Sequence, residues 1–416
     1  MTTVRSQSNM SLIKWLTFLM FMMFAMTTDS VGVIIPEVIK EFHLSMTVAG
    51  TLHYATMSGI AFAAIFLGYL ADKLGRKRTI VLGLVLFALN SYLFAVGKSF
   101  SFFVVLLAIS GIAIGIFKTG ALALIGDISK STTEHTSTMN TVEGFFAVGA
   151  IVGPAVVTLL LVRGTSWKWL YLIAGTICVA LIVTAWFVRY PHTAKKTEKP
   201  IDLRRTLTMM KHPYALGFSA AIFLYVAVES AVYVWMPTLL ATYRGSATFM
   251  AGYAVSVFFV LRAAGRFIGS WILVRLSWTA VLTLFSLAIL VCFVGSMIGG
   301  IGTAVYLLPL SGLFMSVVYP TVNSKGISCF QKSEHGAVAG VILFFTCGAA
   351  VLGPLAMGAI SDSFGDPKYG FILATGLSAL LFLGLLLNWI FNPTRELLRR
   401  LDHSEYGVVA GQSTGV

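Results

Sequence analysis

Charged side chains are scarce in this sequence. Only 11% of its 416 residues are Asp, Glu, Lys or Arg, whereas 57% are apolar. A soluble domain carries about a quarter charged residues, so this chain lacks the polar surface that a water-exposed fold needs. The composition therefore predicts an integral membrane protein that has lipid as most of its solvent.

Cysteine and catalytic signatures are also rare or missing. The four cysteines lie inside apolar runs without a CxxC spacing, so we expect small buried side chains, no metal site and no cofactor. Neither HExxH nor GxSxG occurs, and Gly97-Lys98-Ser99 has Tyr92 where a phosphate-binding loop requires glycine. These absences argue against an enzyme and against an ATP-driven pump.

Apolar runs of membrane-spanning length recur along the whole chain. A transmembrane helix needs about 20 mostly apolar residues. Twelve runs reach this length, at about 13–38, 48–71, 79–97, 101–127, 138–162, 167–188, 214–242, 249–274, 279–299, 302–329, 335–361 and 369–391. The sequence therefore predicts an all-α, multi-pass membrane protein with twelve transmembrane helices, which we place in a bacterial inner membrane.

The polar segments divide these runs into two sets of six. A basic linker, 189–213, separates an N-terminal six-helix bundle (1–188) from a C-terminal one (214–391), and a tail (392–416) follows. Basic residues in short loops stay in the cytoplasm. With the N-terminus inside, cytoplasmic segments hold 19 of the 29 Lys and Arg residues and outside loops hold six. We therefore expect cytoplasmic N- and C-termini, and we attribute the net charge of +13 to orientation and anionic lipid, not nucleic acid.

The two sets share a repeat at an offset near 200 residues. Gly153-Pro154 in the fifth run matches Gly353-Pro354 in the eleventh, and Gly68–Lys77 has an eroded copy at Ser270–Ser277. Many secondary transporters contain such repeats and bind their substrate between them near mid-membrane. The pattern predicts two pseudo-symmetric bundles.

One loop carries a family resemblance. The string Gly68-x-x-x-Asp72-Lys73-x-Gly75-Arg76-Lys77 resembles the loop between helices two and three of the major facilitator superfamily. The resemblance covers the whole chain and implies the two-bundle, alternating-access fold. It also implies a cytoplasmic latch in which the arginine pairs with an acid at the inner end of helix four. The latch residues would be Gly68, Asp72, Gly75, Arg76 and Asp127, whereas Lys77 and Arg78 are either latch residues or topology markers.

Several helices resemble a narrower family, that of the fucose–proton symporter and glucose-permease-like transporters. The similar stretches are 120–127, 140–149, 223–229 and 319–321. The resemblance implies a sugar–proton symporter. Lys118 departs from it, because fucose permeases carry an acidic residue at about that place in helix four.

Ionisable side chains within apolar runs are costly and mark functional sites. Glu229 has Tyr225 and Tyr233 at i−4 and i+4, so the three residues share a helix face. Poorly solvated surroundings suit a carboxyl group that gains and loses a proton during transport. Glu229 is thus the first candidate for proton coupling, followed by Asp29 and Glu143. The alternatives are a structural ion pair at Glu229, packing satisfied by hydroxyl groups at Asp29, and pairing of Glu143 with a basic residue.

Other polar side chains in the same runs are candidates for solute binding. The two tyrosines beside Glu229 can stack on a sugar ring, and Lys118 with Arg262 can form a clamp for a carboxylate. The predicted solute-binding set is Lys118, Arg262, Tyr225, Tyr233, Asn140, Tyr319 and Asn323.

These features predict a secondary active transporter that imports a small polar solute, a monosaccharide or derivative, by proton symport. Sodium is the alternative coupling ion, and a solute sensor with the same fold is an alternative role. A drug–proton antiporter stays open because Gly149-x-x-x-Gly153-Pro154 resembles the start of the antiporter signature. Uptake or exchange of an anionic solute, such as a sugar acid, also stays open. We expect a monomer in the lipid bilayer, without a nucleic-acid partner.

Overall fold

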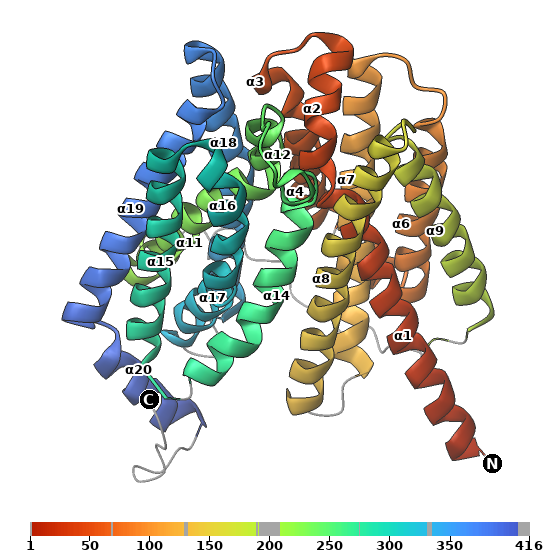
Figure 1. Cartoon of the computed structure of the whole chain (residues 1–416). Coiled ribbons are helices and arrows are strands. Elements are labelled where there is room, and N and C mark those ends of the chain that lie inside the picture. Colours follow the sequence, from red (N-terminus) through yellow and green to blue (C-terminus); the bar gives the residue numbers. More distant parts are fainter. Residues whose placement is uncertain are drawn as a thin grey trace. The chain divides into compact units, whose positions relative to one another are not determined.

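The computed structural model consists of helices in two compact units. It describes residues 2–67, 70–128, 132–188, 190, 209–273, 275–330 and 335–406. The units are Met1–Glu198 and Lys199–Val416, so the division falls inside the predicted linker. Figure 1 shows each unit as a bundle of long helices.

The helices of the first unit follow the first six apolar runs. They are α1 (Thr2–Thr28), α2 (Val31–Phe42), α3 (Met46–Ala49), α4 (Thr51–Phe66), α5 (Leu70–Lys73), α6 (Arg76–Leu93), α7 (Phe100–Ile128), α8 (Thr132–Val162) and α9 (Trp169–Phe187). Helices α1, α6, α7, α8 and α9 contribute the side chains of one continuous apolar core.

The helices of the second unit follow the other six runs, apart from α20 in the tail. They are α11 (Pro213–Ser230), the π-helix η1 (Ala231–Trp235), α12 (Met236–Leu240), α13 (Thr248–Gly252), α14 (Ala254–Leu273), α15 (Trp278–Gly299), α16 (Ile301–Met315), α17 (Val318–Ser328), α18 (His335–Phe364), α19 (Lys368–Phe391) and α20 (Arg395–Tyr406).

Every predicted run is largely helical where the structure describes it. Among the described residues, ten helical stretches are long and apolar enough to cross a membrane. The other two predicted spans correspond to α4, which has 16 residues, and α6, which begins with Arg76-Lys77-Arg78.

Three of the predicted spans are interrupted well inside their length, whereas the second and the eighth are broken near their starts, at Gly50 and Tyr253. The first is broken at Asp29-Ser30, between α1 and α2, and the tenth at Ser316-Val317, between α16 and α17. The seventh passes through the π-helix η1. Proline lacks an N–H and its ring clashes with the carbonyl group four residues earlier. Pro320 therefore accounts for the break at Ser316, and Pro237 for the wide π turn that contains Tyr233.

Two glycines allow the interrupted helices to pack closely against their neighbours. A side chain at Gly153 of α8 would collide with the Met26 carbonyl oxygen and the Ser30 hydroxyl beside the break in the first span. A Cβ atom at Gly353 of α18 would lie 2.9 Å from the Cα and Cβ atoms of Ala227 in α11. The repeated glycine–proline pair therefore allows a close helix contact at both the first and the seventh span.

The two leading carboxylates, Asp29 and Glu229, are related by the same repeat as the two glycines. Asp29 and Glu229 are 200 residues apart, as are Gly153 and Gly353. Asp29 lies in the turn after α1, and Glu229 is the residue before the last in α11, next to η1. Each acid thus stands at an interruption of its helix, at the equivalent position of its repeat.

Candidate functional site

Glu229 is the centre of a polar cluster inside the second unit. Its side chain is buried, with 7% of the residue exposed. Nη2 of Arg262, from α14, lies 2.7 Å from Oε1 of Glu229. The Tyr225 hydroxyl, one turn earlier on α11, lies 2.8 Å from the same oxygen. Glu229 therefore has an ion-pair partner and a hydroxyl partner in an otherwise apolar environment.

Tyr225 connects this cluster to the break in the tenth span. Its hydroxyl oxygen also lies 2.9 Å from the carbonyl oxygen of Met315, the last residue of α16. A phenol has only one proton to donate. When Tyr225 donates to Glu229, the Met315 carbonyl cannot receive the same proton. The two contacts are both hydrogen bonds only when Glu229 is itself protonated and donates to Tyr225.

The π-helix beyond Glu229 is tied to the eleventh span. The indole Nε1 of Trp235 donates a hydrogen bond to the carbonyl oxygen of Pro354, at 3.0 Å. The indole is buried, with 1% of Trp235 exposed. π-Helical turns occur mostly as local features of longer helices and often at functional sites. The helix that carries Glu229 is thus packed against α18 at Pro354.

Other predicted binding residues of the second unit lie around the same helices. The Tyr319 ring centroid lies 6.3 Å from that of Tyr225, and its hydroxyl is 3.4 Å from Oγ1 of Thr346. Tyr233 lies within η1, with its ring centroid 6.3 Å from that of Phe259. The π turn changes the helical register, so the predicted i+4 relationship between Glu229 and Tyr233 does not hold in its α-helical form. Asn323 is half-buried on α17.

The first unit contains the other predicted charges. Asp29 is half-buried, and its Oδ2 accepts a hydrogen bond from the Thr28 hydroxyl at 3.0 Å. Glu143 is exposed on α8. The Lys118 ammonium group lies 5.0 Å from the ring centroid of Phe146 and makes a cation–π contact. The side chain of Asn140 lies outside the described residues.

The partner of Arg262 within the second unit is Glu229, whose Oε1 lies 2.7 Å from Nη2 of Arg262. A structural ion pair at Glu229 was one of the alternatives that the sequence left open. The positive charge of Arg262 is therefore balanced by a carboxylate.

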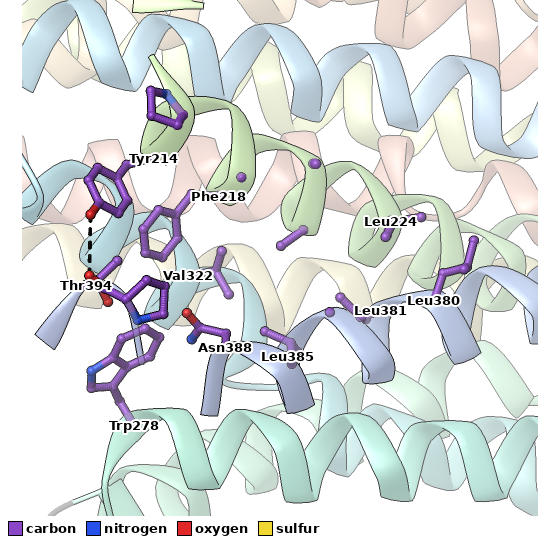
Figure 2. Close-up of a pocket in the computed structure, with 16 residues that line it drawn as sticks. Tyr214, Phe218, Leu224, Trp278, Val322, Leu380, Leu381, Leu385, Asn388 and Thr394 are labelled. Atoms are coloured by element: carbon purple, nitrogen blue, oxygen red, sulfur yellow. Dashed lines mark hydrogen bonds between the residues drawn. The ribbon is translucent and has the colours of Figure 1, made fainter. Parts of the chain in front are cut away.

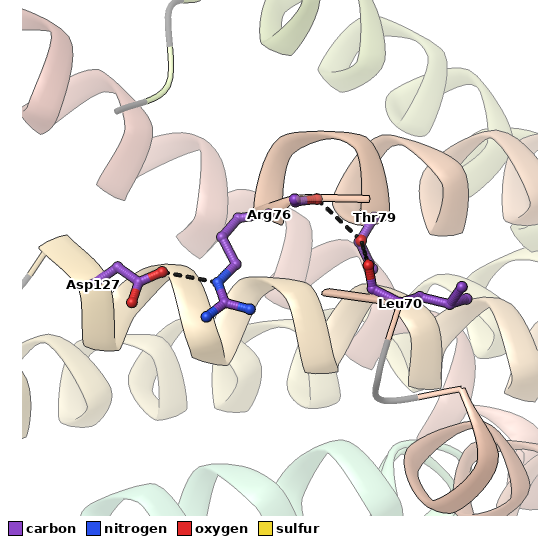
Figure 3. Close-up of polar contacts among 5 residues, drawn as sticks. Leu70, Arg76, Thr79 and Asp127 are labelled. Carbon is purple, nitrogen blue, oxygen red and sulfur yellow. Dashed lines mark hydrogen bonds and ion pairs between the residues drawn. The ribbon is translucent and has the colours of Figure 1, made fainter. Parts of the chain in front are cut away.

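The predicted latch contains the ion pair that the family resemblance implied. Nε of Arg76, at the start of α6, lies 2.8 Å from Oδ2 of Asp127, at the end of α7 (Figure 3). Arg76 is 8% exposed. Gly75 has φ of +85°, a conformation that glycine adopts readily. Figure 3 also shows Thr79, whose hydroxyl lies 2.9 Å from the carbonyl oxygen of Leu70. Gly68 and the Asp72 side chain lie outside the described residues.

Lys77 has a structural role that the sequence did not predict. Its ammonium group donates hydrogen bonds to the carbonyl oxygens of Trp186 and Val188, each at 2.9 Å. It also lies 5.5 Å from the Tyr190 ring centroid. A lysine at a helix C-terminus satisfies the last carbonyl groups and favours the helix dipole. Lys77 therefore caps α9.

Other missed features had a signal in the sequence. The 200-residue offset of the glycine–proline pairs also connects Asp29 with Glu229. Pro237 marked the π-helical turn of the seventh span, whereas the Met315 carbonyl group had no signal because backbone atoms carry no residue identity.

The apolar helices define a multi-pass membrane protein, and sequence comparison identifies its family. Residues 17–354 match the family model of the Major Facilitator Superfamily. The chain belongs to this superfamily, and it is a secondary transporter of the cell membrane, not an enzyme.

Two curated relatives resemble most of the chain. The L-fucose-proton symporter of Escherichia coli (strain K12) is 24% identical over 394 residues, which cover 83% of this chain and 86% of the relative. A TsgA homolog of Citrobacter koseri is 23% identical over 391 residues, which cover 91% of this chain and 94% of the relative. The predicted resemblance to the fucose symporter family is confirmed.

Solved structures confirm the predicted fold class. A crystal structure of the nucleoside transporter NupG matches with a TM-score of 0.76 at 14% identity, covering 90% of this chain and 99% of that one. A structure of the Escherichia coli fucose:proton symporter matches with a TM-score of 0.64 at 20% identity, covering 91% and 99%. At these identities the similarity shows the fold alone.

Proposed function

We propose that this protein imports a small polar solute, a monosaccharide or a close derivative, together with a proton. The observation that carries the proposal is Oε1 of Glu229, which both the Arg262 guanidinium and the Tyr225 hydroxyl contact in the membrane part of the second unit. A buried carboxylate with alternative partners suits reversible protonation. The similarity to a fucose–proton symporter supports the sugar class.

The cluster offers a route from proton binding to helix movement. When Glu229 is ionised, Arg262 balances its charge and the Tyr225 proton points to the carboxylate. A proton on Glu229 removes the charge attraction, and its carboxyl O–H can donate to the Tyr225 oxygen. The Tyr225 proton is then available to the Met315 carbonyl oxygen, 2.9 Å away at the break in the tenth span. Protonation thus moves a hydrogen bond from α11 to α16.

Asp29 is the second proposed proton carrier, because it occupies the equivalent position of the first repeat. It lies at a helix interruption, beside the close contact between α8 and the first span at Gly153. Glu143 is the third. Under this proposal Tyr225, Tyr233 and Tyr319 provide aromatic faces and hydroxyl groups for a sugar, while Lys118, Asn140, Asn323 and Arg262 provide polar contacts. The latch residues Gly68, Asp72, Gly75, Arg76 and Asp127 stabilise one state of the transport cycle.

The Glu229–Arg262 pair also bears on the anionic alternative. A clamp for a carboxylate solute requires cationic groups whose charge is available. Because Glu229 lies 2.7 Å from Arg262, an anionic solute would compete with an internal carboxylate. This arrangement favours a neutral solute over a sugar acid.

The test is proton movement when solute is added to lightly buffered, de-energised vesicles. The panel contains neutral hexoses, deoxyhexoses, sugar acids and lipophilic cations. We expect one neutral sugar to make the external medium more alkaline and Glu229→Gln to abolish this signal. Glu37→Gln is the matched control, because Glu37 pairs with Lys40 at the protein surface. Proton release on addition of lipophilic cations alone would instead identify an antiporter.

A further inference from the structure

The second unit contains a cavity that the proposed transport cycle does not use. It has a volume of about 400 Å³ and lies mainly between α11 and α19, with Trp278 of α15 and Val322 of α17 also in its lining. Phe218, Leu224 and Leu385 are among the apolar side chains along it (Figure 2). Its lining is predominantly apolar, and the polar groups are confined to a few residues.

Two glycines keep this groove open. Gly217 of α11 and Gly384 of α19 both line it, and a Cβ atom added at either would meet no atom within 4 Å. Glycine destabilises a helix interior relative to alanine. In contrast to Gly353, these two glycines are not required by close helix packing. Their effect is to leave a recess between the two helices.

One end of the groove carries an unsatisfied polar group. Thr394 is 2% exposed, and its Oγ1 atom has no hydrogen-bond partner among the described residues. The Tyr214 hydroxyl donates to the carbonyl oxygen of Pro393 at 3.4 Å. Figure 2 shows Tyr214, Asn388 and Thr394 at one end, while Leu224 and Leu380 lie toward the other. A buried hydroxyl normally has a partner, so the polar end suits a ligand with hydrogen-bonding oxygen atoms.

Two basic residues are close in sequence to the residues that line the same end. Exposed Lys211 precedes Pro213, the first residue of α11, by two positions, and exposed Arg395 directly follows Thr394. The N-terminus of α11 adds the partial positive charge that favours phosphate groups. Because the basic linker and tail adjoin this end, the positive-inside rule assigns it to the cytoplasmic leaflet.

We infer that the groove binds an anionic phospholipid of the cytoplasmic leaflet. One acyl chain lies between α11 and α19, along Phe218 and Leu224. The phosphate lies at the polar end, where Thr394 donates a hydrogen bond and Lys211 and Arg395 balance the charge. Burial of acyl methylene groups provides the affinity, and the basic side chains provide the preference for an anionic headgroup.

Native mass spectrometry of the full chain tests this inference. The purified protein is titrated with phosphatidylglycerol or phosphatidylcholine of identical acyl chains. We expect phosphatidylglycerol to bind several-fold more tightly and Gly384→Leu to weaken it about tenfold or more, because the leucine fills the space of the acyl chain. Lys211→Gln with Arg395→Gln should remove the difference between the two lipids.

Gly376→Leu is the matched control. Gly376 is also on α19 and a Cβ atom there would also meet nothing within 4 Å, but it does not line the groove. Its lipid binding should equal that of the wild type, and thermal melting should show that both variants are folded. Equal binding of the two lipids by the wild-type protein would overturn the inference. So would unchanged binding in folded Gly384→Leu, or an equal loss in Gly376→Leu.

Discussion

The guanidinium group of Arg262 lies 2.7 Å from the carboxylate of Glu229 and joins α14 to α11. Removing one partner of a buried ion pair leaves an uncompensated charge. We expect Arg262→Gln to lower the free energy of unfolding by roughly 2–4 kcal/mol at neutral pH.

The double variant Glu229→Gln/Arg262→Gln separates the pair from general packing effects. It should be more stable than Arg262→Gln alone, because neither charge is left unpaired. Thermal unfolding in one detergent, measured for the wild type and all three variants, gives the coupling. Additive losses would contradict a functional ion pair.

Tyr225→Phe tests whether the hydroxyl transmits protonation to the tenth span. The variant retains the ring but loses the contacts with Glu229 and Met315, so we expect a stability loss of about 1 kcal/mol. Accumulation of solute against a gradient should fall more than solute exchange does, because exchange needs no net proton movement. Tyr306→Phe, on the exposed face of α16, is the control and should change neither rate. An equal loss of accumulation and exchange would rule out a coupling role.

Arg76 and Asp127 form the proposed latch, so breaking their 2.8 Å contact should loosen the loop. For Arg76→Gln and Asp127→Asn we expect hydrogen exchange of residues 70–79 to accelerate about tenfold, which corresponds to about 1.4 kcal/mol. Arg78→Gln is the control. Arg78 is exposed, and the ion pair with Asp127 is made by Arg76, two positions earlier. Faster hydrogen exchange in Arg78→Gln, but not in the other two variants, would contradict the prediction. It would show that the positive charge of the loop matters and the ion pair does not.

The close contact of α8 with α1 predicts a strong effect of a single methyl group. Gly153→Ala should cost about 1–3 kcal/mol, because its Cβ atom collides with backbone and side-chain oxygens of the first span. Gly144→Ala in the same helix should be neutral or stabilising by up to about 1 kcal/mol, since a Cβ atom there meets nothing within 4 Å. Thermal unfolding of both variants checks the contrast, and similar melting temperatures would contradict it.

The sequence by itself determined the fold class, the family and the list of candidate charges. Low charge, repeated apolar runs and the Gly68–Lys77 string are local properties, and a membrane allows few ways to satisfy the backbone of an apolar span. Spacing alone also placed Tyr225 beside Glu229. Asp29 and Glu229 occupy equivalent positions of the 200-residue repeat, although the glycine–proline pairs make that repeat easier to recognise.

Only the tertiary structure decided which charges meet. Glu229 and Arg262 are 33 positions apart and come from different helices, so their contact depends on how α11 and α14 pack. The same holds for Tyr225 with the Met315 carbonyl group and for Lys77 with the end of α9. Residue types define which groups can interact. The distances between helices depend on packing and on interruptions such as those near Pro237 and Pro320, and these distances cannot be read from a one-dimensional pattern.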